Sequence, residues 1–273
     1  MPRVRQLSTT LALAVIAGAC STTGIGTGTP AAQIAPMAIP LSTQSATARE
    51  EFLRGVHNLD VEKPVAARQD FNRAVAADPN FALAHLYAAF AAASLPAYRS
   101  HLDQAVRFAD RASPAEQLWV RMEQNGLGND INGQRDLAEQ LVRMTPTDPR
   151  ALANLATVEF AQGRPAEARA TLERAIQVAP SFAPAFIQLG NSYLSVEPSD
   201  AAKAGTYIRQ VLVLEPNEPV AHHYMGNVYR AQNNLPQARA EYTRMIELDP
   251  SSAIGLQLRG HTNSFLGNFA EAR

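Results

Sequence analysis

Short apolar stretches that end in proline recur along the chain at nearly constant intervals. Such stretches precede Pro79, Pro146, Pro180, Pro216 and Pro250. From Pro146 onward the successive intervals are 34, 36 and 34 residues, and Pro79 lies 67 residues, close to two periods, before Pro146. Internal periods of about 20–50 residues are typical of solenoids, in which each unit covers the apolar face of its neighbour. The pattern therefore predicts an array of repeats.

Each period contains two stretches of helical periodicity separated by a turn. In residues 219–252 the apolar positions of the two stretches are Met225, Gly226 and Tyr229, then Ala238, Tyr242 and Met245. Spacings of three and four place each set on one helix face. Residues 233–236 read Asn-Asn-Leu-Pro, which is turn chemistry. Small Gly226 and Ala238 would let the two helices approach, while the tyrosines fill the space beside them.

This pattern resembles the tetratricopeptide repeat, a 34-residue unit of two antiparallel helices. The matching residues in the first, fourth and fifth units are Ala67, Phe71, Ala74 and Pro79; Leu152, Leu155, Ala156, Gly163, Ala168, Leu172, Ala175 and Pro180; and Phe186, Leu189, Gly190, Tyr193, Ala204, Ile208, Val211 and Pro216. Residues 82–148 keep the helical period but lose the Gly and Ala marks. The resemblance covers 48–273 and implies an all-α fold, an α-solenoid of antiparallel helix pairs (TPR-like superhelix).

We expect residues 47–273 to form about six repeats plus an incomplete seventh. The seventh unit begins after Pro250, and Leu256, Gly260 and Gly267 fit it, but the sequence ends at Arg273. Solenoids normally finish with a polar capping element. Either the first helix of this unit is the cap, or the sequence is a fragment of a longer protein. We favour the fragment.

The resemblance also implies a partner-binding groove lined by first-helix positions. Carried over to this sequence, these positions are Arg150, Ala153, Thr157, Phe160, Ile187, Asn191, Leu194, Val220, His223, Asn227, Arg230, Gln257 and His261. Their mixed polar and apolar character suits a protein partner, as an extended peptide or a helix. The alternative is that they only solvate one face. The paired lysines of chaperone-binding relatives are absent.

The first 46 residues predict export and anchoring. Arg3 and Arg5 precede the apolar run Leu11–Ala19, which is too short to span a bilayer and is typical of a signal peptide. Small residues then lead directly to Cys20, the only cysteine. This resembles the bacterial lipobox, so we interpret 1–19 as a lipoprotein signal peptide and Cys20 as acylated; the alternative is a chance cysteine after an ordinary signal peptide. Residues 20–46, with Cys20 acylated, read as a flexible tether, because 21–46 is mostly Ser, Thr, Gly, Ala and Pro and carries no charge.

Composition adds limits on chemistry. Apolar residues make up 46% and charged residues 18%, with a net charge of −1, so the bulk of the chain is globular and nucleic-acid binding is not expected. The single cysteine and the absence of metal-ligand or nucleophile motifs predict no cofactor, no metal site and no catalytic residues. Trp119 is interpreted as a core residue.

Together these features predict a non-enzymatic, membrane-anchored scaffold that binds protein partners in the bacterial cell envelope, as an assembly or biogenesis factor. The residue after the cysteine, Ser21, favours the outer membrane, facing the periplasm. Two alternatives stay open. In the first, the chain is the non-catalytic arm of a larger enzyme truncated at Arg273. In the second, it binds peptides or peptidoglycan fragments.

Overall fold

The computed structural model describes residues 37–271, all of which belong to the second of two units, 1–31 and 32–273. In this described part there are thirteen helices and no strand. They are α1 (Ala46–Asp60), α2 (Pro64–Ala77), α3 (Ala82–Phe90), α4 (Leu95–Ala109), α5 (Pro114–Leu127), α6 (Ile131–Met144), α7 (Pro149–Ala161), α8 (Pro165–Val178), α9 (Ala183–Ser195), α10 (Ala201–Leu214), α11 (Pro219–Ala231), α12 (Leu235–Leu248) and α13 (Ala253–Phe265).

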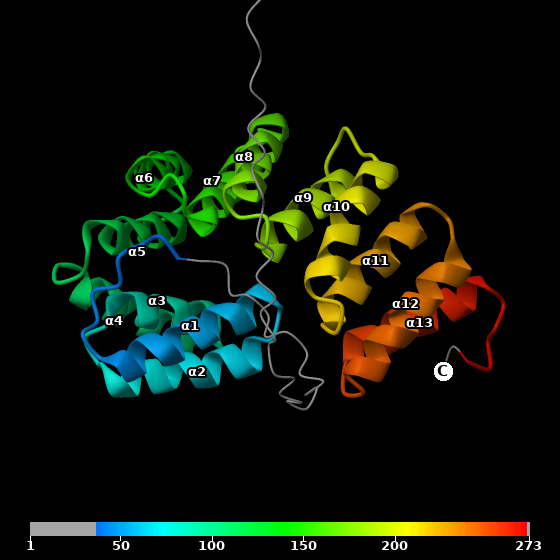
Figure 1. The fold of residues 1–273 in the computed structure, drawn as a ribbon, viewed down its shortest axis with the longest axis horizontal. Helices are drawn as coiled ribbons and strands as arrows, with labels where there is room; N and C mark the ends of the chain where they lie inside the picture. Colours follow the sequence, from blue (N-terminus) through cyan, green and yellow to red (C-terminus); the bar gives the residue numbers. More distant parts are fainter. Residues whose placement is uncertain (1–36, 272–273) are drawn as a thin grey trace, which may run out of the picture. The chain divides into compact units, whose positions relative to one another are not determined.

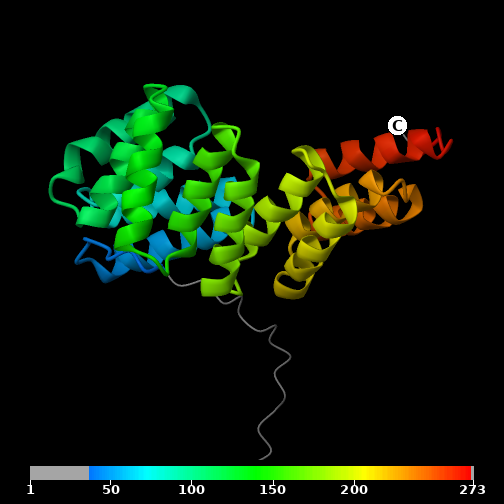
Figure 2. The same cartoon turned by 90° about the horizontal axis from the view of Figure 1, so that it is seen from above.

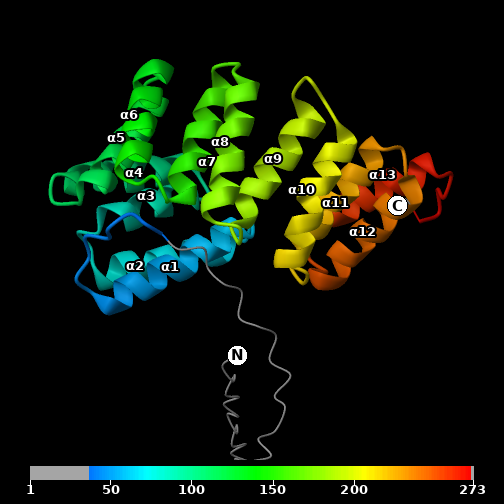
Figure 3. The ribbon, with the colours of Figure 1, turned by 45° about the horizontal axis from the view of Figure 1, so that its top comes forward.

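Consecutive helices pack as hairpins, and each hairpin lies beside the next along the chain (Figures 1 and 3). The hairpins are α1–α2, α3–α4, α5–α6, α7–α8, α9–α10 and α11–α12. The last helix, α13, lies along the final hairpin (Figure 2). This confirms the predicted all-α solenoid of antiparallel helix pairs. Among the described residues no helix combines the length and apolar character needed to cross a membrane.

Three hairpins are closed by a glycine that faces a large side chain on the second helix. A Cβ atom on Gly226 would lie 2.3 Å from Cε1 of Tyr242, and one on Gly190 would lie 2.5 Å from Cδ1 of Ile208. The predicted close approach at Gly226 is therefore confirmed. The same arrangement joins Gly55 of α1 to the ring of Phe71 in α2, at 2.6 Å. We did not predict that pair, because the first helix of the first unit matched the repeat poorly.

Four of the six turns inside the hairpins share one backbone feature. In three of these turns, and in the turn after α13, the second residue past the preceding helix has positive φ and is Asn or Gly: Asn129 (57°), Gly163 (71°), Asn233 (58°) and Gly267 (79°). These residue types tolerate the left-handed region. In the first hairpin the same position is Glu62, with a φ of 56°.

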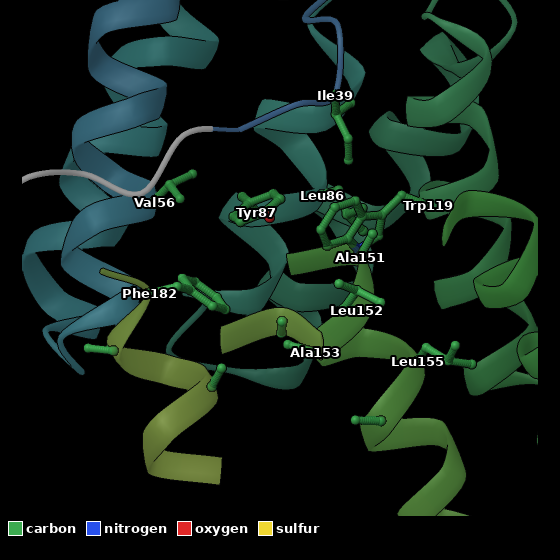
Figure 4. Close-up of a cluster of buried hydrophobic side chains, with 14 of the residues drawn as sticks. Ile39, Val56, Leu86, Tyr87, Trp119, Ala151, Leu152, Ala153, Leu155 and Phe182 are labelled. Atoms are coloured by element: carbon green, nitrogen blue, oxygen red, sulfur yellow. The ribbon is translucent and has the colours of Figure 1, made fainter. Parts of the chain in front are cut away.

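The second and third hairpins are held by a bulky apolar cluster. Trp119 of α5 is only 2% exposed, and its ring lies 5.7 Å from that of Tyr87 in α3. Leu86 and Leu152 pack in the same cluster (Figure 4). The interpretation of Trp119 as a core residue is confirmed. The region that lacks the Gly and Ala marks is thus filled by larger side chains.

Residues 37–45, which we call the strap, lie against these hairpins ahead of α1. Ile39 is 2% exposed and points toward Leu86 and Trp119 (Figure 4). The amides of Ala38 and Ile39 donate to Oδ2 of Asp148, at 2.7 and 3.3 Å. The predicted tether ran from 20 to 46; its last part is packed in the structure, and 20–36 lie outside the described residues. Cys20 and the signal peptide 1–19 also lie outside them.

The strap forms hydrogen bonds with residues that also cap helices. Asp148 accepts from the amides of Arg150 and Ala151 at the start of α7, and Glu116 forms a capping box with Ser113 at the start of α5. Glu116 also accepts from the amide of Ser42 at 3.2 Å. Both carboxylates are fully buried. Buried carboxylates need hydrogen-bond donors, and the strap supplies some of them.

Candidate partner-binding clefts

Two neighbouring clefts lie on the first helices of the later hairpins. The Arg150 cleft, of about 340 Å³, is lined by residues that include Tyr87, Phe90, Arg150, Phe182, Ile187, Asn191 and Tyr224. The His223 cleft, of about 400 Å³, is lined by residues that include Glu218, Val220, His223 and Met245. Both clefts are also lined by the end of the first hairpin at which α1 connects to α2. Glu62 takes part in both clefts, so this end lies between them.

The connection between α1 and α2 reaches two helices of later hairpins. We call residues 60–63 the first turn. Asp60 forms an ion pair with Arg150, at the start of α7. The hydroxyl of Tyr224 in α11 donates to Oε1 of Glu62 at 2.6 Å.

The third residue of the first turn with such a contact is Lys63. Its Nζ lies 2.6 Å from Oε2 of Glu218, the N-cap of α11. The first turn is therefore bound by groups from α7 and α11, about 90 to 160 residues further along the chain.

Burial sets the electrostatics of the Arg150 cleft. The Arg150 side chain is 5% exposed, and its guanidinium carbon lies 5.0 Å from the centre of the Phe182 ring. Burial raises the pKa of the Asp60 carboxyl, and the nearby Arg150 opposes that rise. Burial, together with the hydrogen bond to the Glu62 carboxylate, raises the pKa of the Tyr224 hydroxyl, which therefore stays a donor at neutral pH.

The His223 cleft contains a histidine that is kept neutral. Burial lowers the pKa of His223, and the charge of Glu62 opposes this effect. Its ring stacks on Tyr224 with the centroids 4.7 Å apart. The adjacent His222 pairs instead with Glu241, at 2.7 Å, so the two histidines do not face one ion. Over the described residues there is no group of three or more metal-ligating side chains.

The structure brings together some of the predicted groove residues. Arg150, Ala153, Ile187 and Asn191 all line the Arg150 cleft. Val220 and His223 line the other one. Side chains of residue types that suit peptide recognition thus lie side by side on α7, α9 and α11.

The other predicted residues do not line either cleft. The Thr157 hydroxyl donates to the carbonyl of Ala153 at 3.0 Å, and Asn227 accepts from the Tyr242 hydroxyl at 2.8 Å, so both bond within their own hairpins. Phe160 and Leu194 are half-buried against the core. Three further residues are not part of the lining of either cleft: Arg230, Gln257 and His261.

Sequence reasoning missed Asp60, Glu62 and Tyr224. The two carboxylates look like ordinary solvated charges next to a turn, and no spacing links them to residues far along the chain. A signal was nevertheless present. Glu62 stands at the position where three of the other hairpin turns carry Asn or Gly.

Comparison with family models identifies the repeats. Residues 135–189 and residues 219–252 each match a tetratricopeptide repeat model. These two segments are tetratricopeptide repeats. They include Arg150, Ile187 and His223, so both clefts are built in part on this repeat.

One relative matches about half of this chain. Cellulose synthase operon protein C of Xanthomonas axonopodis pv. citri (strain 306) is 30% identical over 135 residues, which is 47% of this chain. The chain spans only 9% of the length of that relative.

Two solved structures resemble the fold. MamA from Desulfovibrio magneticus RS-1 (residues 41 to the end) is 16% identical, with a TM-score of 0.50 over 58% of this chain and 88% of that one. In the Cut9–Hcn1 hetero-tetramer of the APC/C, the matched chain is 20% identical, with a TM-score of 0.52 over 79% of this chain and 43% of that one. At these identities the likeness shows the fold alone.

Proposed function

We propose that the chain is a scaffold that binds protein partners in the Arg150 and His223 clefts at a membrane of the bacterial cell envelope. The lining of the Arg150 cleft carries this proposal. Arg150, Asn191 and Tyr224 offer polar groups beside the apolar surface of Phe182 and Ile187. Such a lining suits an extended peptide or a helix, because apolar pockets supply affinity and a few polar groups fix register.

The membrane part of the proposal is supported by the sequence. The apolar run Leu11–Ala19 leads directly to Cys20, the only cysteine in the chain. Each buried CH₂ of a lipid contributes about 0.8 kcal/mol, so several acyl chains hold a protein stably. We place the scaffold on the outer membrane, facing the periplasm, where it acts as an assembly or biogenesis factor.

Photo-crosslinking in cells tests partner binding. A photoreactive amino acid at half-buried Asn191 is inside the Arg150 cleft, whereas one at exposed Gln210 on α10 is outside both clefts. We expect a discrete adduct from position 191 and none from 210. Equal adducts at both positions, or none at either, would reject the scaffold proposal.

Metabolic labelling tests the anchor separately. Full-length wild type and Cys20→Ala are expressed with a radioactive or clickable palmitate. We expect label and membrane fractionation for wild type only. A membrane-bound, unlabelled wild type would show attachment by another route and would leave the cleft proposal intact.

A second candidate is the non-catalytic arm of an envelope polysaccharide synthesis system. It is favoured by the 30% identity to cellulose synthase operon protein C. Deleting the gene and measuring Calcofluor-binding polysaccharide distinguishes the candidates. A loss of polymer that the Cys20→Ala protein restores fully would support this role without the lipid anchor.

A further inference from the structure

The first turn fills the space between the two clefts as a ligand would. Val61 of this turn is buried in the apolar core, whereas the three charged residues of the turn make polar contacts with later hairpins. Asp60 pairs with Arg150, Glu62 accepts from Tyr224 and Lys63 pairs with Glu218. Each charged residue of the turn thus has a complementary partner on a later hairpin.

The backbone of this turn shows that Glu62 is an unusual choice. In four other turns the equivalent position also has positive φ, and there it is Asn or Gly: Asn129, Gly163, Asn233 and Gly267. Glycine and asparagine adopt that conformation more readily than glutamate does. Glu62 has a φ of 56°, and its side chain accepts from the Tyr224 hydroxyl, 2.6 Å away. The turn geometry does not need a glutamate, but the contact with α11 does.

The receiving groups define a chemical preference. Arg150 is buried and offers a guanidinium to one carboxylate, while Phe182 supports its plane from one side. Tyr224, which also interacts with Asn191, offers a hydroxyl to a second carboxylate two residues later. Glu218 then accepts a basic side chain at the next position. Charge-assisted hydrogen bonds to fixed donors give both strength and register.

We propose that the two clefts bind an acidic segment of a partner protein, in the place that the first turn occupies. The segment has two carboxylates separated by one residue and followed by a basic residue. This proposal rests on the proposed scaffold function and names the chemistry of its partner. The first turn is then a built-in competitor that the partner displaces.

An internal competitor sets the apparent affinity. A tethered ligand acts at a high effective concentration, so an external peptide binds only to the fraction of molecules whose turn has left the clefts. The apparent dissociation constant is the intrinsic one divided by that open fraction. Weakening the first turn must therefore tighten the binding of an external acidic peptide. Neutralising the peptide must remove its binding.

The probe is a fluorescein-labelled peptide with the sequence of residues 58–64, acetylated and amidated at its ends. Its matched control carries the changes Asp60→Asn and Glu62→Gln. Both are titrated by fluorescence anisotropy into the full-length chain, as wild type and as the opened variant Asp60→Asn/Glu62→Gly. Glycine at 62 is the residue that the fourth hairpin has at its equivalent position, Gly163, so the turn itself keeps its backbone.

We expect the opened variant to bind the acidic peptide at least tenfold more tightly than wild type, and we expect neither protein to bind the neutral peptide. Adding Tyr224→Phe to the opened variant should weaken binding about tenfold or more, since one hydrogen bond to a charged group is lost. Tyr229→Phe, on the same helix, should leave it unchanged. Raising the salt concentration should weaken binding, because the contacts are ionic.

Equal affinity of wild type and opened variant, or equal binding of the two peptides, would overturn the proposal. So would a dimer of the opened variant in sedimentation, because the turn of a second copy would then be the occupant. If Asp60→Asn leaves Arg150 poorly compensated and the double variant melts early, Glu62→Gly alone gives the same comparison. A crosslink from Asn191 that persists while both peptides fail would reject the acidic ligand and retain the scaffold.

Discussion

The hairpins α3–α6 and the hairpins α7–α12 reach the same packing by different means. In the later hairpins small residues on the first helix face large ones on the second, as Gly226 faces Tyr242 and Gly190 faces Ile208. In the earlier ones the space is filled by Trp119 and Tyr87, and by Ile39 from the strap. The first solution uses contacts within one repeat. The packing of the earlier hairpins depends on the strap, which lies more than a hundred residues before Asp148, the main acceptor of its hydrogen bonds.

This difference has a consequence for stability. In regular repeats the free energy of unfolding is approximately a sum of repeat and nearest-neighbour terms. A strap that bonds to both α5 and α7 adds a coupling between hairpins that such a sum does not include. We therefore expect substitutions in the earlier hairpins to lower the stability of more distant helices than substitutions in the later hairpins do.

The largest expected effect is in the earlier hairpins. Trp119→Ala should lower the free energy of unfolding by about 3–5 kcal/mol, because it leaves a cavity at a site that is 2% exposed. Urea unfolding followed by circular dichroism measures the change, with Trp119→Phe as a milder control. A loss below about 1 kcal/mol for the alanine variant would contradict a core role and the comparison drawn from it.

The strap should come next. Ile39→Ala should cost about 2–4 kcal/mol, since Ile39 is 2% exposed and its removal leaves apolar neighbours without contact. The matched control is Ile254→Ala on α13, where the side chain is 48% exposed and little should change. Hydrogen exchange should also show faster exchange at the start of α7. If both variants melt alike, the strap does not stabilise these hairpins.

The glycines test the later hairpins. Gly226→Ala should cost about 1–3 kcal/mol, because its Cβ would meet the Tyr242 ring at 2.3 Å and the ring must move. In the earlier region Gly128→Ala should be near neutral, since the nearest heavy atom would lie 3.5 Å from the methyl carbon that alanine adds. Thermal melting of the pair checks this. Equal melting temperatures would mean that close helix approach is not what holds α11 to α12.

The smallest effect is on the pH dependence. Burial lowers the pKa of His85 below 6.5, against the opposing hydrogen bond to the Pro79 carbonyl and the charge of Asp78. Burial and the neighbouring His85 also lower the pKa of His101. The unfolded chain then takes up protons first as the pH falls through 6.5, so stability is present above that pH and is lost below it.

We expect the melting temperature to fall as the pH drops from 8 to 5. Each histidine contributes at most about 1.4 kcal/mol for every tenfold difference in proton affinity between the folded and the unfolded chain. His85→Gln should flatten the profile. His261→Gln, at an exposed position of α13, should not. A His85→Gln profile that keeps the wild-type slope would place the pH sensitivity elsewhere.

The sequence was informative where the determinants are local. The spacing of Gly226, Ala238 and Tyr242 predicted the α11–α12 hairpin because all three lie within one repeat. The strap could not be predicted, because its apolar residues Met37, Ile39 and Leu41 are too few, and interrupted by Pro40, to indicate which helices they pack against. Its acceptor, Asp148, looks like an ordinary N-cap. The contact of Glu62 with Tyr224 could not be predicted either, because it depends on how far each hairpin rotates relative to the preceding one.

The strap also determines how the repeats respond to pulling. Tension applied ahead of residue 37 reaches the folded part through the amides of Ala38 and Ile39, which both bond to one carboxylate, that of Asp148. The same carboxylate caps α7, so a load on the strap acts directly on the start of that helix. Forced unfolding is governed by the barrier of the first element to yield. In this molecule we expect that element to be the strap, which would detach under load before any hairpin opens.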